Sequence, residues 1–106
     1  MIQAISFEEG KRILDTHPGA VLVDVRTEYE YAAGHAAGAV LLTLEEIDET
    51  DVCSLLPDFH APVLLYCRTG RRSAQAAAKL FDLGYETIFD LGGLNGWPYG
   101  MEYGLL

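Results

Sequence analysis

The sequence is poor in positive charge. Seven lysine and arginine residues stand against sixteen acidic ones, which gives the 106-residue chain a formal net charge of −9. A protein that binds nucleic acid gains much of its affinity from a basic surface that neutralises phosphate groups. The composition therefore predicts that this protein has no nucleic-acid partner.

Long apolar runs are missing as well, and cysteine is rare. No stretch approaches the roughly 18 apolar residues that are needed to cross a bilayer. Residues 1–9 carry neither the basic nor the apolar region of a secretory signal. Two cysteines make no disulfide framework, and free thiols suit a reducing compartment. We therefore expect a cytoplasmic protein with no membrane partner.

The few basic residues that are present cluster in one place. Three of the seven lie between Arg68 and Arg72, within the segment Cys67-Arg-Thr-Gly-Arg-Arg-Ser73. Such a cluster can outweigh the negative charge of the whole chain within the screening length of about 8–10 Å. The segment lies between an apolar run of strand length, Pro62–Tyr66, and a helical pattern, Ala74–Leu83. It is therefore predicted to be a loop that joins a strand to a helix.

Strand and helix patterns alternate along the whole chain. Strands are predicted at Ala20–Val25, Val40–Leu42, Pro62–Tyr66 and Glu86–Asp90. Capping boxes and apolar periodicity predict helices at Phe7 to about Asp15, Thr27 to near Gly34, Thr43 to about Thr50, and Ala74–Leu83. This alternation predicts one α/β domain with a mainly parallel sheet. Ligands of such sheets bind beyond the carboxyl ends of the strands, where Cys67 is expected to lie.

The helix after the loop is predicted to pack on the sheet through small residues. One face of the predicted helix carries the residues at positions i, i+3, i+4 and i+7, which are Ala74, Ala77, Ala78 and Phe81. Gly84 is placed to end this helix in a left-handed conformation.

Cys67 is the candidate nucleophile. A thiol attacks as its thiolate, and the pKa of a free cysteine is about 8.5. The predicted helix start and the loop arginines would favour the anion, and Gly70 would let the backbone N–H groups turn toward the sulfur. The alternative is a small buried hydrophobe beside solvated arginines. We place the reactive cysteine ahead of that alternative because the thiol, the arginines and the glycine coincide at one turn.

The sequence resembles the rhodanese-like sulfurtransferases from about Ile5 to Trp97. The resemblance rests on Val21-Leu-Val-Asp-Val-Arg26 with the Glu30-Tyr31, Gly34-His35 and Gly38-Ala39 pairs, on the loop from Cys67 to Ser73, and on Leu91-Gly-Gly-Leu-Asn-Gly-Trp97. One departure is Ala36-Ala37, where the family often has a bulky apolar residue and a proline.

The resemblance implies a single rhodanese-like domain over residues 1–106, with a core at about 5–97 and a short tail at 98–106. The fold would be a central, mostly parallel five-stranded sheet with helices on both faces.

The resemblance also implies persulfide chemistry without a cofactor. Cys67 would take a sulfane sulfur from a small anionic donor such as thiosulfate, and cyanide or a thiol would remove it. The expected substrate-binding residues are Arg68, Thr69, Gly70, Arg71, Arg72 and Ser73. Of the arginines, we expect Arg72 to point into the pocket because it is the last loop residue before the helix.

Two other functions stay open. The protein could be a persulfide carrier that exchanges sulfur with a protein donor or acceptor. It could also resemble phosphatases and arsenate reductases, in which an arginine follows the cysteine after five residues and clamps phosphoryl oxygens. Ser73 occupies that position here, and the arginine comes one residue early at Arg72. The shorter loop favours a cradle for one sulfur.

Several other polar residues are predicted to be structural. Asp24 and Arg26 share one side of a strand near its carboxyl end, and we expect a partly buried ion pair ahead of substrate binding by Arg26. His35 is expected to stabilise a turn and not to act as a base for Cys67. No group of metal ligands is visible at the required spacing, so we predict no metal site.

The remaining candidates have modest predicted roles. Cys53 follows the acidic residues 45–51 and is expected to be a packing cysteine and not a resolving thiol for Cys67. His17 and His60 are expected to be solvated beside turns. The aromatic residues Trp97, Tyr99 and Tyr103 are expected to cover the core, and they could also line the entrance for the acceptor.

Overall fold

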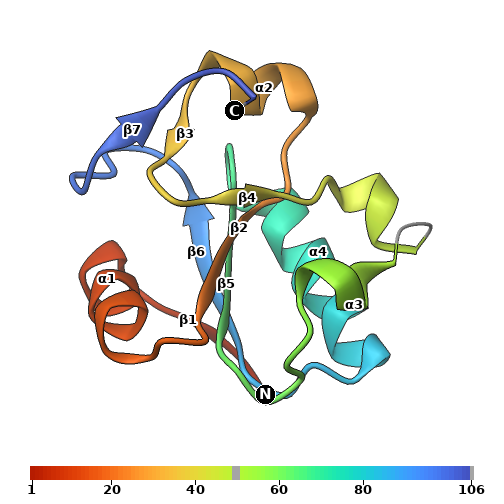
Figure 1. The fold of residues 1–106 in the computed structure, drawn as a ribbon. Helices are drawn as coiled ribbons and strands as arrows, with labels where there is room; N and C mark the ends of the chain where they lie inside the picture. The colour runs from red at the N-terminus through yellow and green to blue at the C-terminus, as the bar shows by residue number, and fades with distance from the viewer. Residues whose placement is uncertain (49–50, 106) are drawn as a thin grey trace.

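A five-stranded parallel sheet lies at the centre of the structure, a computed structural model that describes residues 1–48 and 51–105 (Figure 1). Its strands lie in the order β1-β6-β5-β2-β4, and all neighbouring pairs run parallel. Their bounds are Ile2–Ala4 (β1), Val21–Asp24 (β2), Val40–Leu41 (β4), Val63–Cys67 (β5) and Ile88–Gly93 (β6). The predicted parallel sheet is therefore confirmed.

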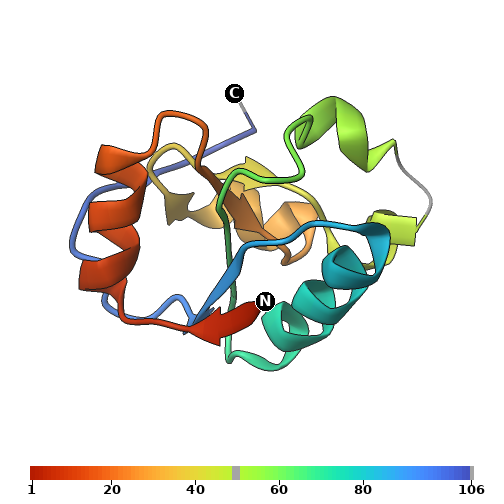
Figure 2. The ribbon, with the colours of Figure 1, turned by 90° about the horizontal axis from the view of Figure 1, so that it is seen from below.

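Helices cover both faces of this sheet, as the resemblance implied (Figure 2). Their bounds are Phe7–Thr16 (α1), Glu28–Ala33 (α2), Val52–Leu55 (α3) and Arg71–Leu83 (α4), with a 3-10 helix at Leu44–Asp48 (η1). Helix α1 lies on one face, and α3 and α4 lie on the other. None of the helices within residues 1–48 and 51–105 is long and apolar enough to cross a membrane.

Successive side chains of the central strands enter two separate core layers. Leu22 and Leu64 pack on the side of α1, whereas Val23, Leu65 and Cys67 pack on the side of α4. All five residues of β5 are buried, as expected for a central strand covered on both faces. The side chain of Cys67 therefore belongs to the layer beneath α4.

The buried face of α4 differs from the predicted one. The buried residues are Ser73, Ala76, Ala77 and Leu80, while Ala74, Ala78 and Phe81 are exposed. The helix begins at Arg71, and Ser73 in its first turn faces the Cys67 sulfur at 3.5 Å. This contact sets the rotation of the helix, so the inward face lies one residue earlier in the chain. The predicted stop at Gly84 is confirmed by its φ of +111°.

The predicted helix from Thr43 to about Thr50 is wrong in type. The structure has the 3-10 helix η1 there, and the last two predicted residues lie outside the described part of the chain. The hydroxyl of Thr43 donates to a carboxylate oxygen of Glu46 at 2.6 Å. Because this contact joins two side chains, it does not make the reciprocal side chain–backbone pairing of a capping box.

A small antiparallel sheet lies beyond the carboxyl ends of the central strands (Figure 1). It pairs β3 (His35–Ala36) with β7 (Met101–Glu102). These strands and β1 were not predicted, because none of them forms an apolar run like the one at Val40–Leu42. Together with α2, the small sheet stands above the end of β5, where Cys67 lies.

Candidate active site

Cys67 is the last residue of β5, at the carboxyl end of a central strand. It lies opposite Gly93 of β6, and the N–H of Leu94 donates to its carbonyl oxygen at 2.8 Å. The Cys67 side chain is 0% exposed. The candidate nucleophile therefore sits at the edge where parallel sheets bind ligands, with its sulfur covered by the chain that follows it.

The loop after Cys67 turns back on the sulfur. Gly70 adopts the left-handed region with φ +95° and ψ −12°, where a residue with a β-carbon would be strained. Its N–H donates to the Sγ of Cys67 at 2.9 Å. The neutral thiol of Cys67 also donates to the hydroxyl oxygen of Ser73 at 3.5 Å. The loop thus forms a cradle around the sulfur, which we call the sulfur cradle (residues 67–73).

These contacts favour the thiolate. Burial acts to raise the pKa of the Cys67 thiol, but hydrogen bonds from Ser73, Gly70 and Thr69 outweigh it and hold the pKa below its ordinary value. Most of these bonds come from backbone N–H groups. The partial positive charge at the start of α4 acts in the same direction. The loop amides converge on the sulfur, as the sequence led us to expect.

The side chain of Ser73 lies inside the sulfur cradle. It is 0% exposed, and its hydroxyl lies 3.2 Å from the carbonyl oxygen of Gly70, to which it can donate. The prediction grouped Ser73 with residues that touch substrate. Its side chain is fully buried and ties the loop to the first turn of α4.

The end of β6 forms the floor of the sulfur cradle. A β-carbon at Gly93 would lie 2.5 Å from the carbonyl oxygen of Arg68 and 3.2 Å from the Cα of Thr69. Only glycine lets the loop approach the strand this closely. The Gly-Gly pair belongs to a motif noted in the sequence, but its role as a floor was missed because no local pattern shows which segment lies above it.

The loop arginines have different surroundings. Arg72 forms a two-point ion pair with Glu30 of α2, with Nη1–Oε1 at 2.7 Å and Nη2–Oε2 at 3.0 Å. Arg68 lines an open cavity, and Arg71 is exposed at the start of α4. The expectation that Arg72 points into the pocket therefore does not match the structure, since a carboxylate already holds its guanidinium. Of the three loop arginines, Arg68 lines the cavity, and Arg26, which is paired with Asp24, lines it as well.

This cavity has a volume of about 460 Å³. Its wall includes Tyr29 and Glu30 of α2, Arg68 and Leu94 beside the cradle, and two residues of the segment after Pro98. Arg68 follows Cys67 directly, and the N–H of Leu94 donates to the carbonyl oxygen of Cys67, so the cavity lies beside the backbone of the candidate nucleophile. We call it the loop cavity. Two smaller, mostly apolar cavities lie away from the loop, one beside Val21 and Val63 and one beside Cys53.

Asp24 and Arg26 form a buried ion pair beside the site. The Arg26 Nη2 atom donates to Asp24 Oδ2 at 2.7 Å and to the carbonyl oxygen of Gly34 at 2.6 Å. The hydroxyl of Tyr66 also donates to Asp24 Oδ2 at 2.7 Å and accepts from the N–H of Ala36. Burial and the hydrogen bond and charge of Asp24 raise the pKa of Tyr66. These contacts tie β2 and β5 to the turn before β3.

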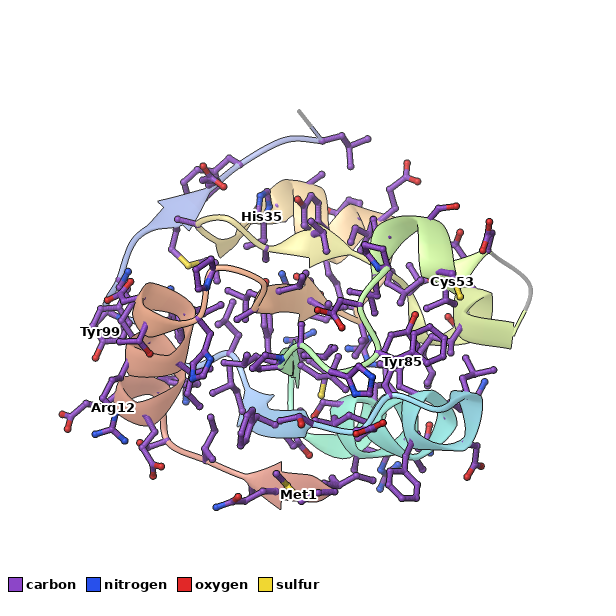
Figure 3. The ribbon with its side chains drawn as sticks, turned by 60° about the horizontal axis from the view of Figure 1, so that its bottom comes forward. Met1, Arg12, His35, Cys53, Tyr85 and Tyr99 are labelled. Carbon is purple, nitrogen blue, oxygen red and sulfur yellow. The ribbon has the colours of Figure 1, made fainter. Side chains whose placement is uncertain are left out.

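The contacts of His35 are with residues of α2 and β7, on either side of the turn that precedes β3. Its Nδ1 lies 2.8 Å from the carbonyl oxygen of Tyr31, and the two rings stack with centroids 3.6 Å apart. Its Nε2 lies 3.7 Å from a carboxylate oxygen of Glu102 in β7. Figure 3 shows His35 beside α2 and the small sheet. These partners hold the turn between α2 and β3.

Other predicted residues lie away from the cradle. Cys53 is exposed on α3, at the rim of the molecule in Figure 3, so the expectation that it packs in the core is wrong. Trp97 is buried between Phe7 and Tyr99, as a core cover requires, but Tyr103 is 69% exposed.

The two other histidines have exposed side chains. The N–H of His17 caps α1, whereas His60 lies 3.1 Å from a carboxylate oxygen of Glu86. Within residues 1–48 and 51–105, no three histidine, cysteine or acidic side chains are grouped so that they could hold a metal ion.

The chain is similar in sequence to known proteins along most of its length. A family model described as Rhodanese-like domain matches residues 6–98. Thiosulfate sulfurtransferase GlpE of Pseudomonas fluorescens (strain SBW25) is 36% identical over 98 residues, which cover 84% of this chain and 85% of the relative. Thiosulfate sulfurtransferase PspE of Escherichia coli (strain K12) is 36% identical over 73 residues, 69% of each chain.

Solved structures agree with the fold. A structure described as rhodanese with anions from E. coli has a TM-score of 0.74 at 32% identity, and the match covers 80% of this chain and 99% of the other. The human single-domain sulfurtransferase TSTD1 has a TM-score of 0.75 at 25% identity, covering 89% of this chain and 92% of that one.

Proposed function

The chain belongs to the rhodanese-like domain family, and from this membership we propose that it is a sulfurtransferase that carries sulfane sulfur as a persulfide on Cys67. The observation that supports the proposal best is the 2.9 Å hydrogen bond from the Gly70 N–H to the buried Sγ. A donor aimed at the sulfur stabilises a thiolate before transfer and a persulfide after it.

The first half of the reaction loads the sulfur. The Cys67 thiolate attacks the outer sulfur of a donor such as thiosulfate, and a new S–S bond forms. The bond between the two sulfurs of the donor breaks, and sulfite leaves with the electron pair. Cys67 then carries a terminal sulfur with one negative charge. Arg68, which faces the loop cavity, supplies positive charge for the anionic donor.

The second half returns the enzyme to its starting state. A nucleophile such as cyanide or a thiolate attacks the terminal sulfur, the S–S bond breaks, and Cys67 leaves as thiolate. Cyanide becomes thiocyanate, and a thiol becomes a persulfide. Because the protein alternates between two covalent states, ping-pong kinetics are expected. A protein thiol could serve as donor or acceptor in the same way, which is the carrier alternative.

The phosphatase alternative fits the geometry less well. A phosphate clamp needs an arginine at the position that buried Ser73 occupies, and the neighbouring Arg72 is held by Glu30. The sulfur cradle therefore offers its N–H donors to one sulfur atom and has a buried serine in place of the arginine that clamps phosphoryl oxygens.

Persulfide formation can be tested by intact-mass measurement. Incubation with thiosulfate should add the mass of one sulfur atom, and a thiol or cyanide should remove it. The Cys67→Ser variant should gain no sulfur. Cys53→Ser is the matched control, since it removes the exposed thiol on α3, and it should load normally. If the unaltered protein gains no sulfur from any sulfane donor, the proposal is wrong.

A further inference from the structure

One wall of the loop cavity is built from residues that follow the family match. The matched region ends at residue 98, yet Met101 and Tyr103 line the cavity opposite α2. We call residues 99–105 the tail wall. Its position means that the cavity beside Cys67 depends on a segment that the family model does not cover.

The tail wall is attached to the rest of the site at several points. Its strand β7 pairs with β3, and the carbonyl oxygen of Gly100 accepts from the N–H of Ala37 at 3.0 Å. The carboxylate of Glu102 accepts from the N–H of Gly38 at 2.9 Å. Further along, the N–H of Gly104 donates to the carbonyl oxygen of Ala32 at 2.8 Å. These contacts hold the tail wall against α2, β3 and the turn that follows β3.

The side chains that the tail wall offers to the cavity are apolar or aromatic. Met101 and Tyr103 both line the cavity, and the side chains of both lie close to Gly34. They are 39% and 69% exposed, and Tyr29 on the α2 side of the cavity is 84% exposed. These groups leave apolar surface open beside Arg68, where a bound ligand would remove it from water.

The size of the loop cavity indicates a ligand larger than an inorganic ion. A water molecule takes up about 30 Å³ in the liquid, and the cavity holds about 460 Å³. Cavities of roughly 300–1,000 Å³ are typical of sites for organic molecules. Cyanide would leave most of this space and the exposed aromatic surface unused.

We propose that Met101 and Tyr103 select the sulfur acceptor, and that they favour an organic thiol with an aromatic or apolar body and an anionic group. The body would pack against Tyr103, Met101 and Tyr29, and Arg68 would bind the anionic group. The inference rests on the proposed sulfur transfer, because it concerns the second half of that reaction. The aryl thiolate attacks the terminal sulfur, the S–S bond to Cys67 breaks, and an aryl persulfide leaves.

The test compares acceptors on protein that has already been loaded. The persulfide form is prepared with thiosulfate and checked by mass, then mixed separately with cyanide, mercaptoethanol and mercaptobenzoate. In Tyr103→Ala and Met101→Ala, the kcat/KM for mercaptobenzoate should fall roughly tenfold, as expected for lost apolar contact. The rates with cyanide and mercaptoethanol should stay within about twofold.

Two further variants serve as controls. Tyr103→Phe keeps the ring and should retain the rate with mercaptobenzoate. Phe81→Ala removes a 49% exposed aromatic side chain from α4, away from the cavity, and should change none of the rates. If Tyr103→Ala and Met101→Ala lower kcat/KM equally for all acceptors, or do not lower it for mercaptobenzoate, the tail wall does not select the acceptor. A failure of the unaltered protein to load sulfur would instead contradict the proposed function.

Discussion

At Cys67, burial and hydrogen bonding act on the thiol in opposite directions. Burial disfavours the charged form, whereas the bonds from Ser73, Gly70 and Thr69 favour it, and their sum lowers the pKa. The Gly70 amide bond is 2.9 Å long and the Ser73 hydroxyl contact is 3.5 Å. The bonds that favour the thiolate come from the loop itself and not from a histidine.

Replacing Ser73 by alanine should raise the pKa of Cys67, because it removes the hydroxyl bond and leaves the burial in place. The pH dependence of Cys67 alkylation in a Cys53→Ser background would measure this rise. Thr69→Ala is the control, since Thr69 acts through its backbone N–H. An unchanged or lower pKa in Ser73→Ala would contradict this account.

The sequence was sufficient to identify Cys67 and Gly70, because their roles follow from their own chemistry and from the strand-to-helix turn between them. The role of Arg72 was misjudged because it depends on Glu30, which lies 42 residues away in the chain. Chain position within the loop gave no information about that partner. Burial of Ser73 could not be predicted either, since it depends on how far α4 is rotated about its axis.

At the scale of elements, the sulfur cradle depends on how closely the loop lies on β6. The strand ends in Gly92 and Gly93, and the loop backbone passes directly over the second of these. A register shift between Leu65 and Tyr66 brings Cys67 opposite Gly93. Strand β6 therefore determines how close the loop lies to the sheet and which residue of β6 lies opposite Cys67.

Gly93→Ala should disturb the cradle, because its β-carbon would lie 2.5 Å from the Arg68 carbonyl oxygen and backbone would have to move. We expect a loss of about 1–3 kcal/mol in the free energy of unfolding, together with slower sulfur loading. Urea unfolding and the loading rate would measure the two effects. Gly19→Ala meets a side chain at 3.4 Å in ordinary contact and should be tolerated. Normal stability and loading in Gly93→Ala would show that the loop does not need this floor.

The elements themselves were predictable where they were long. The apolar runs of β2 and β5 predict buried parallel strands, and both strands are found. The capping box predicted at Thr27 is also found, at the start of α2. The short strands β1, β3 and β7 gave no such signal. For the tail wall the sequence leaves two roles open, a cover of the core and a lining of the acceptor entrance, because a sequence of glycines and tyrosines does not show which strand it pairs with.

At the scale of the whole molecule, the Glu30–Arg72 ion pair joins the two sides of the site. Glu30 lies in α2 and Arg72 in α4, which follow different strands of the sheet. The hydrogen bond from Arg72 is the main cause that lowers the pKa of Glu30 to about 2, against burial, with further bonds from Thr27. The pair stabilises the folded state while Glu30 is ionised.

Because the pKa of Glu30 is lowered on folding, its contribution to stability is present above about pH 4.5 and is lost as the pH falls toward 2. Glu30→Gln should reduce the free energy of unfolding at pH 7 by on the order of 1–2 kcal/mol, since glutamine can keep the capping box but not the charge. The difference from the unaltered protein should shrink below pH 4.5. Urea unfolding across this range would measure it.

Glu28→Gln is the matched control for this prediction, because Glu28 is an exposed carboxylate on the same helix. It should change stability by less than about 0.5 kcal/mol at either pH. If Glu30→Gln is no less stable than the unaltered protein at pH 7, or if the difference grows on acidification, the ion pair does not have the assigned role.

The complete burial of the Cys67 side chain has a consequence for regioselectivity. In the proposed persulfide the inner sulfur would be enclosed by the loop, and the terminal sulfur would be the atom open to attack. A thiol that attacked the inner sulfur would expel hydrosulfide and remain joined to the protein as a mixed disulfide. A thiol that attacked the terminal sulfur would leave with it. Packing around one atom would thus direct the incoming nucleophile to the outcome that regenerates the enzyme.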